Sequence, residues 1–330
     1  MPTITEKLLN RYVRHALLLE RLKNGEVRRW VGDLNANVLA DIDDVALRGV
    51  DRIRGRGAKV FETGLWRRLD SRMRAVSRET MTAWHSRLAT SLDELAKSEG
   101  AFGFRVIRQA VKAGVPVGQA SASVLRAIRT SRPFQGRLLR EWATKLDRDT
   151  YDRLRGAIRT GMVNGESTSE IMRRVRNGPQ GMKVSRRDAA MIVRTAVTHV
   201  AARAVQAAGM ANPTIFDRMI WQAILDSRTS AICLDLHGDI FPIDRGPRPP
   251  AHPFCRSQMG LVAIGDDPVE TTGDEWLAAQ STEMQDSILG PGRARIFRSG
   301  KVPFHRFVTG EQRTLSLREL EALEVRLERV

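Results

Sequence analysis

The chain has 330 residues, 42% of them hydrophobic, which is enough for two or three domains of about 100 to 200 residues each. Lysine and arginine total 54 against 38 acidic residues, and the formal net charge is +16. No uninterrupted apolar run reaches the roughly 18 residues of a membrane span, and Glu6, Arg11 and Arg14 break any signal-peptide core, so we expect a soluble protein made in the cytoplasm. Two cysteines exclude a disulfide framework.

The positive charge is concentrated in the first part of the chain. Residues 1–200 carry 39 basic and 21 acidic side chains, whereas residues 201–330 carry 15 and 17. Such a field suits a polyanion, either nucleic acid or an acidic protein surface, although a solvated arginine-rich helix face would look the same. The densest basic region supplies the candidate nucleic-acid-binding residues Arg126, Arg129, Arg132, Arg137, Arg140 and Lys145.

Residues 1–150 are predicted to form a basic helical domain. Apolar residues recur at helical spacing after a cap at Thr3 or Thr5, again from Val27 to about Ile53, and over residues 65–98. Trp84 falls among leucines in the third stretch, so it is interpreted as a core residue. Shorter helices follow.

Residues 151–265 are predicted to form a small mixed domain, followed by a tail subdomain over 266–330. A capping box at Ser167–Glu170 begins a short helix, and an alanine-rich helix covers about 189–208. Strands are predicted only after it, at 219–225, 239–242 and 259–264. A helix near 275–288, a turn at 289–292 and a last helix begun by a box at Ser316–Glu319 complete an α+β chain with a long helical N-terminal region. No nucleotide-binding loop occurs.

The stretch from Trp221 to Ser257 holds both cysteines and two of the six histidines. Cys233 and His237 are four residues apart on one face of a predicted helix, and His252 and Cys255 are three apart beyond a proline-rich excursion. Two thiols and two imidazoles are zinc ligands in kind and number, so Cys233, His237, His252 and Cys255 form a candidate structural zinc site. The alternative interpretation is that the cysteines are buried small apolar residues and His252 bonds a backbone carbonyl.

The same stretch contains a compound motif of Trp221, Asp226, Arg228-Thr229-Ser230, Cys233, Gly238, His252 and Cys255-Arg256. In these residues it resembles the phage Mu F-like minor head proteins, also called phage head morphogenesis proteins. The resemblance covers about residues 155–310, and its tail is seen at Trp276–Gln280 and Leu289–Arg293. The family does not imply a four-ligand zinc site or a catalytic set. The matching motif residues, interpreted as structural, are Arg194, Trp221, Asp226, Arg228, Thr229, Cys233, Gly238, His252, Cys255 and Arg256.

The resemblance implies a non-enzymatic, low-copy minor head protein inside the phage head. Its expected partners are the portal protein and packaged double-stranded DNA bound without sequence specificity, with the major capsid or scaffold protein as further candidates and no membrane. Head assembly or genome delivery is the expected role. The alternative is a virion-borne enzyme, either a metal-dependent DNA hydrolase or a toxin-like transferase, with His252, Asp226 and Arg228 as its polar residues. No second carboxylate or nucleophile stands near them at catalytic spacing.

Overall fold

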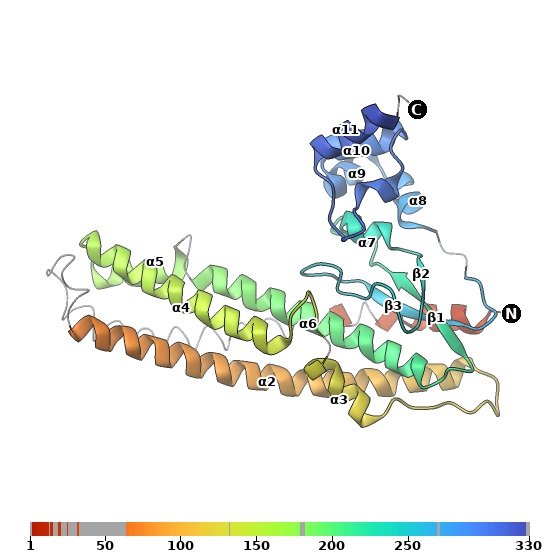
Figure 1. Cartoon of the computed structure of the whole chain (residues 1–330), viewed down its shortest axis with the longest axis horizontal. Helices are drawn as coiled ribbons and strands as arrows, with labels where there is room; N and C mark the ends of the chain where they lie inside the picture. Colours follow the sequence, from red (N-terminus) through yellow and green to blue (C-terminus); the bar gives the residue numbers. More distant parts are fainter. Residues whose placement is uncertain are drawn as a thin grey trace. The chain divides into compact units, whose positions relative to one another are not determined.

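The computed structural model describes residues 2–12, 14, 15, 19, 20, 25, 32, 64–131, 133–178, 182–268 and 271–327. The chain divides into two compact units that alternate along the sequence. The first unit comprises residues 1–20, 95–128 and 198–330, and the second comprises 21–94 and 129–197. The α+β fold class is confirmed, with helices throughout and one small sheet (Figure 1). The consecutive domains 1–150, 151–265 and 266–330 stay a prediction.

The second unit is built from helices. It contains most of α2 (Gly64–Ala110), α4 (Leu139–Val163), α5 (Thr168–Asn177) and the first part of α6 (Met182–Met210). Leu146, Leu154 and Ile158 of α4 are buried at the spacing of one helix face. Polar side chains join α4 to its neighbours: Tyr151 donates to Asp70 of α2 at 2.8 Å, and Ser77 donates to Asp147 at 2.8 Å. Figure 1 shows α4 running alongside α2.

The sequence located α2 correctly over 65–98 but stopped it too early. The helix continues through Gly100 and Gly103 to Ala110. Gly100 allows a close approach there: a Cβ atom would lie 2.8 Å from a methyl group of Leu125 in α3 (Ala122–Ser131), and that side chain would have to shift. Trp84 is 1% exposed, which confirms it as a core residue. The helix predicted from Val27 to Ile53 lies outside the described residues, apart from Gly32.

The first unit contains a three-stranded antiparallel sheet in the order β2-β1-β3. The strands are β1 (Phe216–Gln222), β2 (Ile240–Pro242) and β3 (Gln258–Ala263), so all three strand predictions are confirmed within a few residues. Met219 of β1 pairs with Phe241 on one side and Leu261 on the other. Every residue of β3 is buried. Its outer edge is covered by the N-terminal helix, where the Thr5 hydroxyl accepts a hydrogen bond from the Ala263 amide at 2.9 Å.

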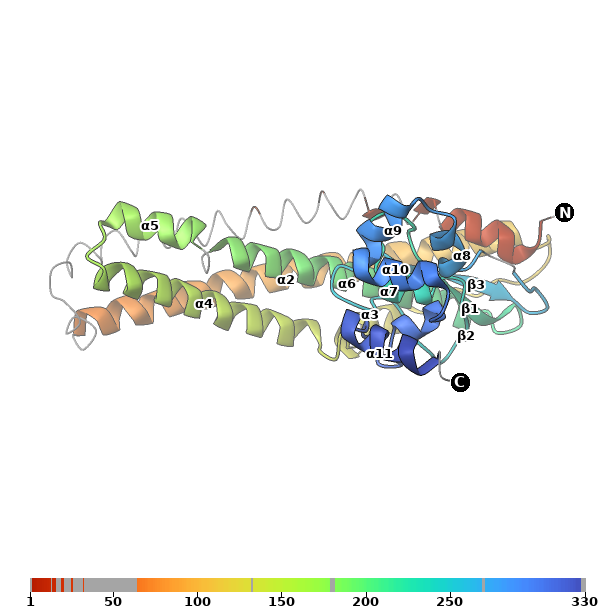
Figure 2. The same ribbon diagram turned by 90° about the horizontal axis from the view of Figure 1, so that it is seen from above.

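Short helices complete the first unit (Figure 2). They are α7 (Ala231–Asp235), α8 (Gly273–Ala278), α9 (Thr282–Leu289), α10 (Pro291–Ser299), the 3-10 helix η2 (Phe304–Phe307) and α11 (Leu317–Leu327). The single helix predicted at 275–288 is wrong, because Ser281 caps a new helix by accepting from the Met284 amide at 3.3 Å. The predicted turn at 289–292 instead starts α10, with Pro291 in its first turn. No helix in the described ranges is both long and apolar enough to cross a membrane.

Helix α7 connects two apolar clusters of this unit. Cys233 belongs to the cluster that contains Trp221 and the sheet. Ala231 and Leu234, on its other side, belong to the cluster formed by the C-terminal helices. Helix α8 approaches α7 so closely that a Cβ atom on Gly273 would lie 2.0 Å from the Leu234 carbonyl oxygen. The short helix that carries Cys233 is therefore packed on two faces.

Candidate functional site

The segment after β1 folds into a turn fixed by its own side chains. The Asp226 amide donates to the Thr229 hydroxyl at 2.8 Å, and that hydroxyl donates to the Ile224 carbonyl at 2.7 Å. The Arg228 amide donates to the Asp226 carboxylate at 2.8 Å. Ser230 then caps α7 by accepting from the Cys233 amide at 3.2 Å. Short polar side chains satisfy backbone groups that lack helix or strand partners, which explains the Asp-x-Arg-Thr-Ser pattern.

Asp226 is held by an ion pair with Arg256. One guanidinium nitrogen lies 2.7 Å from the Asp226 carboxylate, and the Arg256 side chain is only 13% exposed. Hydrogen bonding from Arg256, with smaller contributions from Arg228, holds the pKa of the Asp226 carboxyl well below its usual range. Arg228 itself is mostly exposed. A carboxylate so strongly stabilised as the anion is a poor general base, so this pair closes the turn onto the start of β3.

Cys233, His252 and Cys255 come together beside this ion pair. Their ligand atoms all lie within 4.8 Å of one another. The Cys233 Sγ atom is 3.1 Å from His252 Nε2 and 3.7 Å from Cys255 Sγ. Ser230 Oγ also lies 2.8 Å from His252 Nε2. Both thiols are free and buried. We call these three residues the Cys-His group.

A tight turn places His252 and Cys255 on the same side of the chain. The Cys255 amide donates to the His252 carbonyl at 3.1 Å, and Phe254 between them has φ +62°. A non-glycine residue in the left-handed region costs about 1 kcal/mol or more, so surrounding contacts must impose it. One such contact is the Thr198 hydroxyl, which donates to the Cys255 carbonyl at 2.9 Å.

The two thiols differ in acidity because they share one hydrogen bond. That bond, with smaller contributions from Ser230 and Ser257, lowers the pKa of Cys233 to about 7 against the opposing effect of burial. The same bond, together with burial, raises the pKa of Cys255. Cys233 is therefore the more acidic thiol of the pair.

His237 does not join the Cys-His group, contrary to the four-residue prediction. Its Nδ1 atom accepts a hydrogen bond from the Ala223 amide at 3.0 Å, and burial lowers the pKa of the imidazole. It therefore ties α7 to the end of β1. Gly238, at φ +90°, ends this connection and donates to the Trp221 carbonyl at 3.0 Å. Helical spacing placed Cys233 and His237 on one face, but α7 ends at Asp235, before the histidine.

Residues 152–259 match the family described as Phage Mu protein F like protein. This segment is a Mu F-like domain. The match supports a phage Mu F-like head morphogenesis protein. No curated protein and no solved structure gives a significant match.

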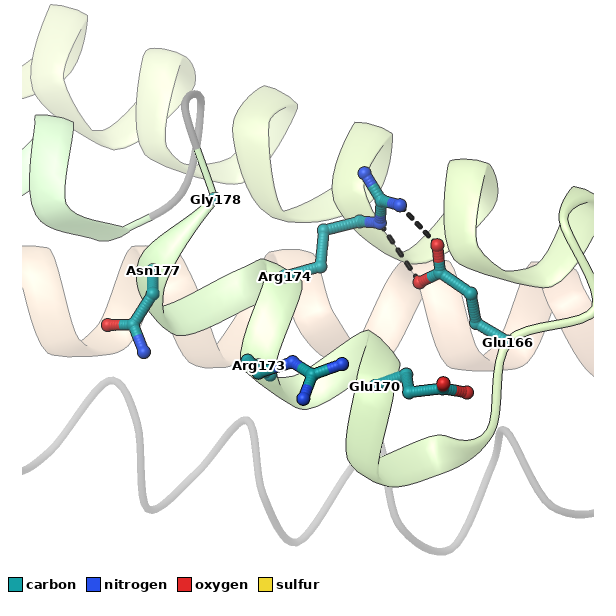
Figure 3. Close-up of a pocket in the computed structure, with 6 residues that line it drawn as sticks. All are labelled: Glu166, Glu170, Arg173, Arg174, Asn177 and Gly178. Atoms are coloured by element: carbon teal, nitrogen blue, oxygen red, sulfur yellow. Dashed lines mark hydrogen bonds and ion pairs between the residues drawn. The ribbon is translucent and has the colours of Figure 1, made fainter.

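The Mu F-like domain includes the whole Cys-His group and the Asp226–Arg256 pair. Arg194 belongs to its α6 segment, in the second unit, and is partly buried. Trp221 is fully buried in the core of the first unit. The domain also contains a cleft of about 320 Å³ in the second unit, at α5. Figure 3 shows that two of its charged side chains are paired with each other: Arg174 Nε donates to Glu166 at 3.0 Å, and this bond lowers the pKa of Glu166.

The predicted nucleic-acid-binding residues differ in their surroundings: some form ion pairs within the protein, whereas others are exposed. Arg129 forms a two-pronged ion pair with Asp93 at 2.8 and 3.1 Å, and Lys145 pairs with Asp149. Arg126 is exposed in the first unit, and Arg137 lies over the Trp142 ring at 5.4 Å. Arg132 lies outside the described residues. Arg140 lines a cavity of the second unit.

Arg140 shares this cavity with residues that the sequence pattern did not single out. A cleft of about 440 Å³ in the second unit is lined by residues of α2 and α4. We call it the basic cleft, since its charged side chains are Arg74, Arg78, Arg140, Arg148 and one carboxylate, Asp147. His85 also lines it, and burial followed by the charge of Arg129 lowers its pKa, so the imidazole is neutral at pH 7. The four-residue spacing of Arg74 and Arg78 was the available signal, but only tertiary packing brings them to α4.

Proposed function

We propose that this protein is a minor head protein that lies inside the phage head, in low copy, against the portal and the packaged DNA. It acts there in head assembly or genome delivery. The observation that carries the proposal is the presence, in one chain, of a Mu F-like segment and of a strongly basic helical unit that contains the first part of that segment. The major capsid and scaffold proteins are further candidate partners.

The charge of the two units supports a DNA-facing role for the second. Residues 21–94 and 129–197 contain 31 basic and 18 acidic residues, a net charge of +13. The other unit contains 23 and 20, a net charge of +3. A polyanion such as duplex DNA is attracted to the unit with the larger charge, because counterions are released from its phosphates on binding.

The basic cleft is the feature of that unit best suited to phosphate. Its four arginines are exposed, and neither Arg78, Arg140 nor Arg148 has an ion-pair partner within the described part of the chain. The single carboxylate, Asp147, is occupied by the Ser77 hydroxyl. Guanidinium groups bind phosphate through paired N–H donors. Base-stacking side chains such as Phe, Tyr and Trp are missing from the described lining, which favours binding without sequence preference.

A charge-reversal experiment tests the DNA contact. The triple variant Arg78→Glu, Arg140→Glu, Arg148→Glu of the full chain should bind random duplex DNA roughly tenfold more weakly or worse, equally for every sequence. The slope of log affinity against log salt should fall by about 1 for each phosphate that the variant no longer neutralises. The matched control, Arg306→Glu, Arg318→Glu, Arg326→Glu, makes the same change in net charge at exposed positions of the first unit.

Equal reductions in affinity for both triple variants would mean that net charge alone, and not the basic cleft, controls binding. The location in the virion needs a separate experiment. Cryo-electron microscopy of virions, with and without the gene product, should show density for a few copies at the inner face of the portal vertex. Density on the outer shell or tail would contradict the proposed position. Heads that lack the protein should be misassembled or should fail to deliver DNA.

A further inference from the structure

We propose that Cys233, His252 and Cys255 bind one zinc ion that holds the Mu F-like domain together. The three residues come from two separate segments of the fold: Cys233 lies on α7, whereas His252 and Cys255 lie on the turn before β3. An ion bound by all three would clamp the helix to the sheet. This proposal does not depend on the role of the protein in the phage head.

Two of the three distances between the ligand atoms are close to those around a tetrahedral ion. Two thiolates, each about 2.3 Å from zinc, lie roughly 3.8 Å apart in a tetrahedral site. The observed Cys233 Sγ to Cys255 Sγ distance is 3.7 Å. A thiolate and an imidazole nitrogen on the same ion lie roughly 3.5 Å apart, and Cys233 Sγ is 3.1 Å from His252 Nε2. The two sulfurs are too far apart for a disulfide, whose S–S bond is about 2.05 Å.

The histidine is oriented as a zinc ligand. His252 Nδ1 lies 2.8 Å from the Pro253 carbonyl oxygen, which can only accept a hydrogen bond. The proton of a neutral imidazole is therefore on Nδ1, and the Nε2 lone pair points to Cys233 and Ser230. Metal-binding histidines commonly donate their second N–H to a carbonyl in this way, which fixes the ring. The two cysteines are also held in place by hydrogen bonds of their backbone. The Cys255 carbonyl accepts from the Thr198 hydroxyl, and the Cys233 amide donates to the Ser230 hydroxyl.

The space beside the group is suited to a small fourth ligand. A cavity of about 20 Å³ is lined by Cys233 and His252 together with Ser230, Ser257 and other neighbours. A water molecule needs about 10 to 15 Å³ of such space. One water, or the Ser230 hydroxyl, would complete four-coordination. With Ser230 as the fourth ligand the ion is closed off by protein and serves the structure of the domain.

Metal analysis of the native chain tests the proposal without any variant. Protein purified without chelators should contain about one zinc per chain, and X-ray absorption should show two sulfur ligands at about 2.3 Å. Cobalt substituted for zinc should produce thiolate-to-cobalt charge-transfer absorption. A chain without zinc that also takes up neither zinc nor cobalt would overturn the proposal. Zinc bound only through nitrogen and oxygen, or a chain whose two thiols are joined as a disulfide, would overturn it as well.

Matched variants test which residues bind the ion. Cys255→Ser and His252→Gln should lose most of the zinc, and chelator should lower the melting temperature of the native chain but not theirs. His237→Gln and the exposed control His305→Gln should keep a full equivalent. Loss of zinc from the His237 variant with unchanged circular dichroism would overturn the three-residue set. Full zinc content in either the Cys255 or the His252 variant would overturn the assignment of that residue.

Discussion

The Cys-His group and the basic cleft present opposite kinds of polar chemistry. Cys233 and Cys255 are buried, and each makes hydrogen bonds to neighbours. Arg78, Arg140 and Arg148 are exposed, and the described residues give them no ion-pair partner. Groups satisfied inside the fold contribute to its stability, whereas solvated charges contribute little to stability and remain available to a ligand. We therefore expect substitutions near the Cys-His group to change the free energy of unfolding, and substitutions in the basic cleft to change the affinity for DNA.

The largest effect is expected at the core that supports the Cys-His group. Trp221→Ala removes a fully buried indole from the cluster that contains both cysteines. The variant should lose about 4 kcal/mol of unfolding free energy, since no neighbour can fill a cavity of that size. Chemical denaturation followed by circular dichroism measures this. DNA affinity at low salt should stay unchanged while the chain is folded, and a loss of affinity at full helicity would show that the two regions are coupled.

A second test compares glycines of the two units. Gly273→Ala places a methyl group against the Leu234 carbonyl where α8 meets α7, and it should destabilise the chain by about 2 kcal/mol. Gly156→Ala is the control, because nothing lies within 4 Å of a Cβ atom at that position of α4. It should stabilise the second unit by about 0.5 to 1 kcal/mol through higher helix propensity. Equal melting temperatures for both variants would contradict the packing of α7 against α8.

The Asp226–Arg256 pair should make the stability of the first unit depend on pH. The folded-state pKa of Asp226 lies below its usual value of 3.8, so the pair stabilises the fold fully above about pH 5 and loses this contribution as the pH falls further. Asp226→Asn should cost about 2 kcal/mol at pH 7. The difference in melting temperature between wild type and variant should therefore shrink between about pH 5 and about pH 2.5. A constant difference would mean that the carboxylate charge is not what holds Arg256.

The smallest stability effect is expected in the basic cleft. Arg78→Ala and Arg148→Ala should each change the free energy of unfolding by less than about 0.5 kcal/mol, because neither guanidinium has a described ion-pair partner to lose. Both should reduce the salt dependence of DNA binding. Arg129→Ala is the contrasting variant, since it breaks the ion pair with Asp93 and should lower stability more than it lowers DNA affinity. If the cleft variants lost as much stability as Arg129→Ala, the proposed difference between the unpaired cleft arginines and the ion-paired Arg129 would be wrong.

Local patterns in the sequence determined much of this protein. The capping boxes at Ser167 and Ser316 form as predicted, with Glu170 and Glu319 returning to the backbone amides of the capping residues at 2.7 Å. The three strands form within a few residues of the predicted ranges, and the Mu F-like motif predicted the family whose model matches residues 152–259. These features succeed because each is decided within a few residues, by hydrogen bonds or side-chain periodicity that the sequence states directly.

Only the tertiary structure decided which distant residues meet. His237 shares helical spacing with Cys233 but is excluded from the Cys-His group, because α7 ends after five residues and the imidazole bonds the end of β1. Arg74 and Arg148 line the same cleft because α2 packs against α4. The sequence also did not show that the guanidinium of Arg129 pairs with Asp93 of α2. Long-range packing sets these distances, and no periodicity within a single helix or strand contains that information.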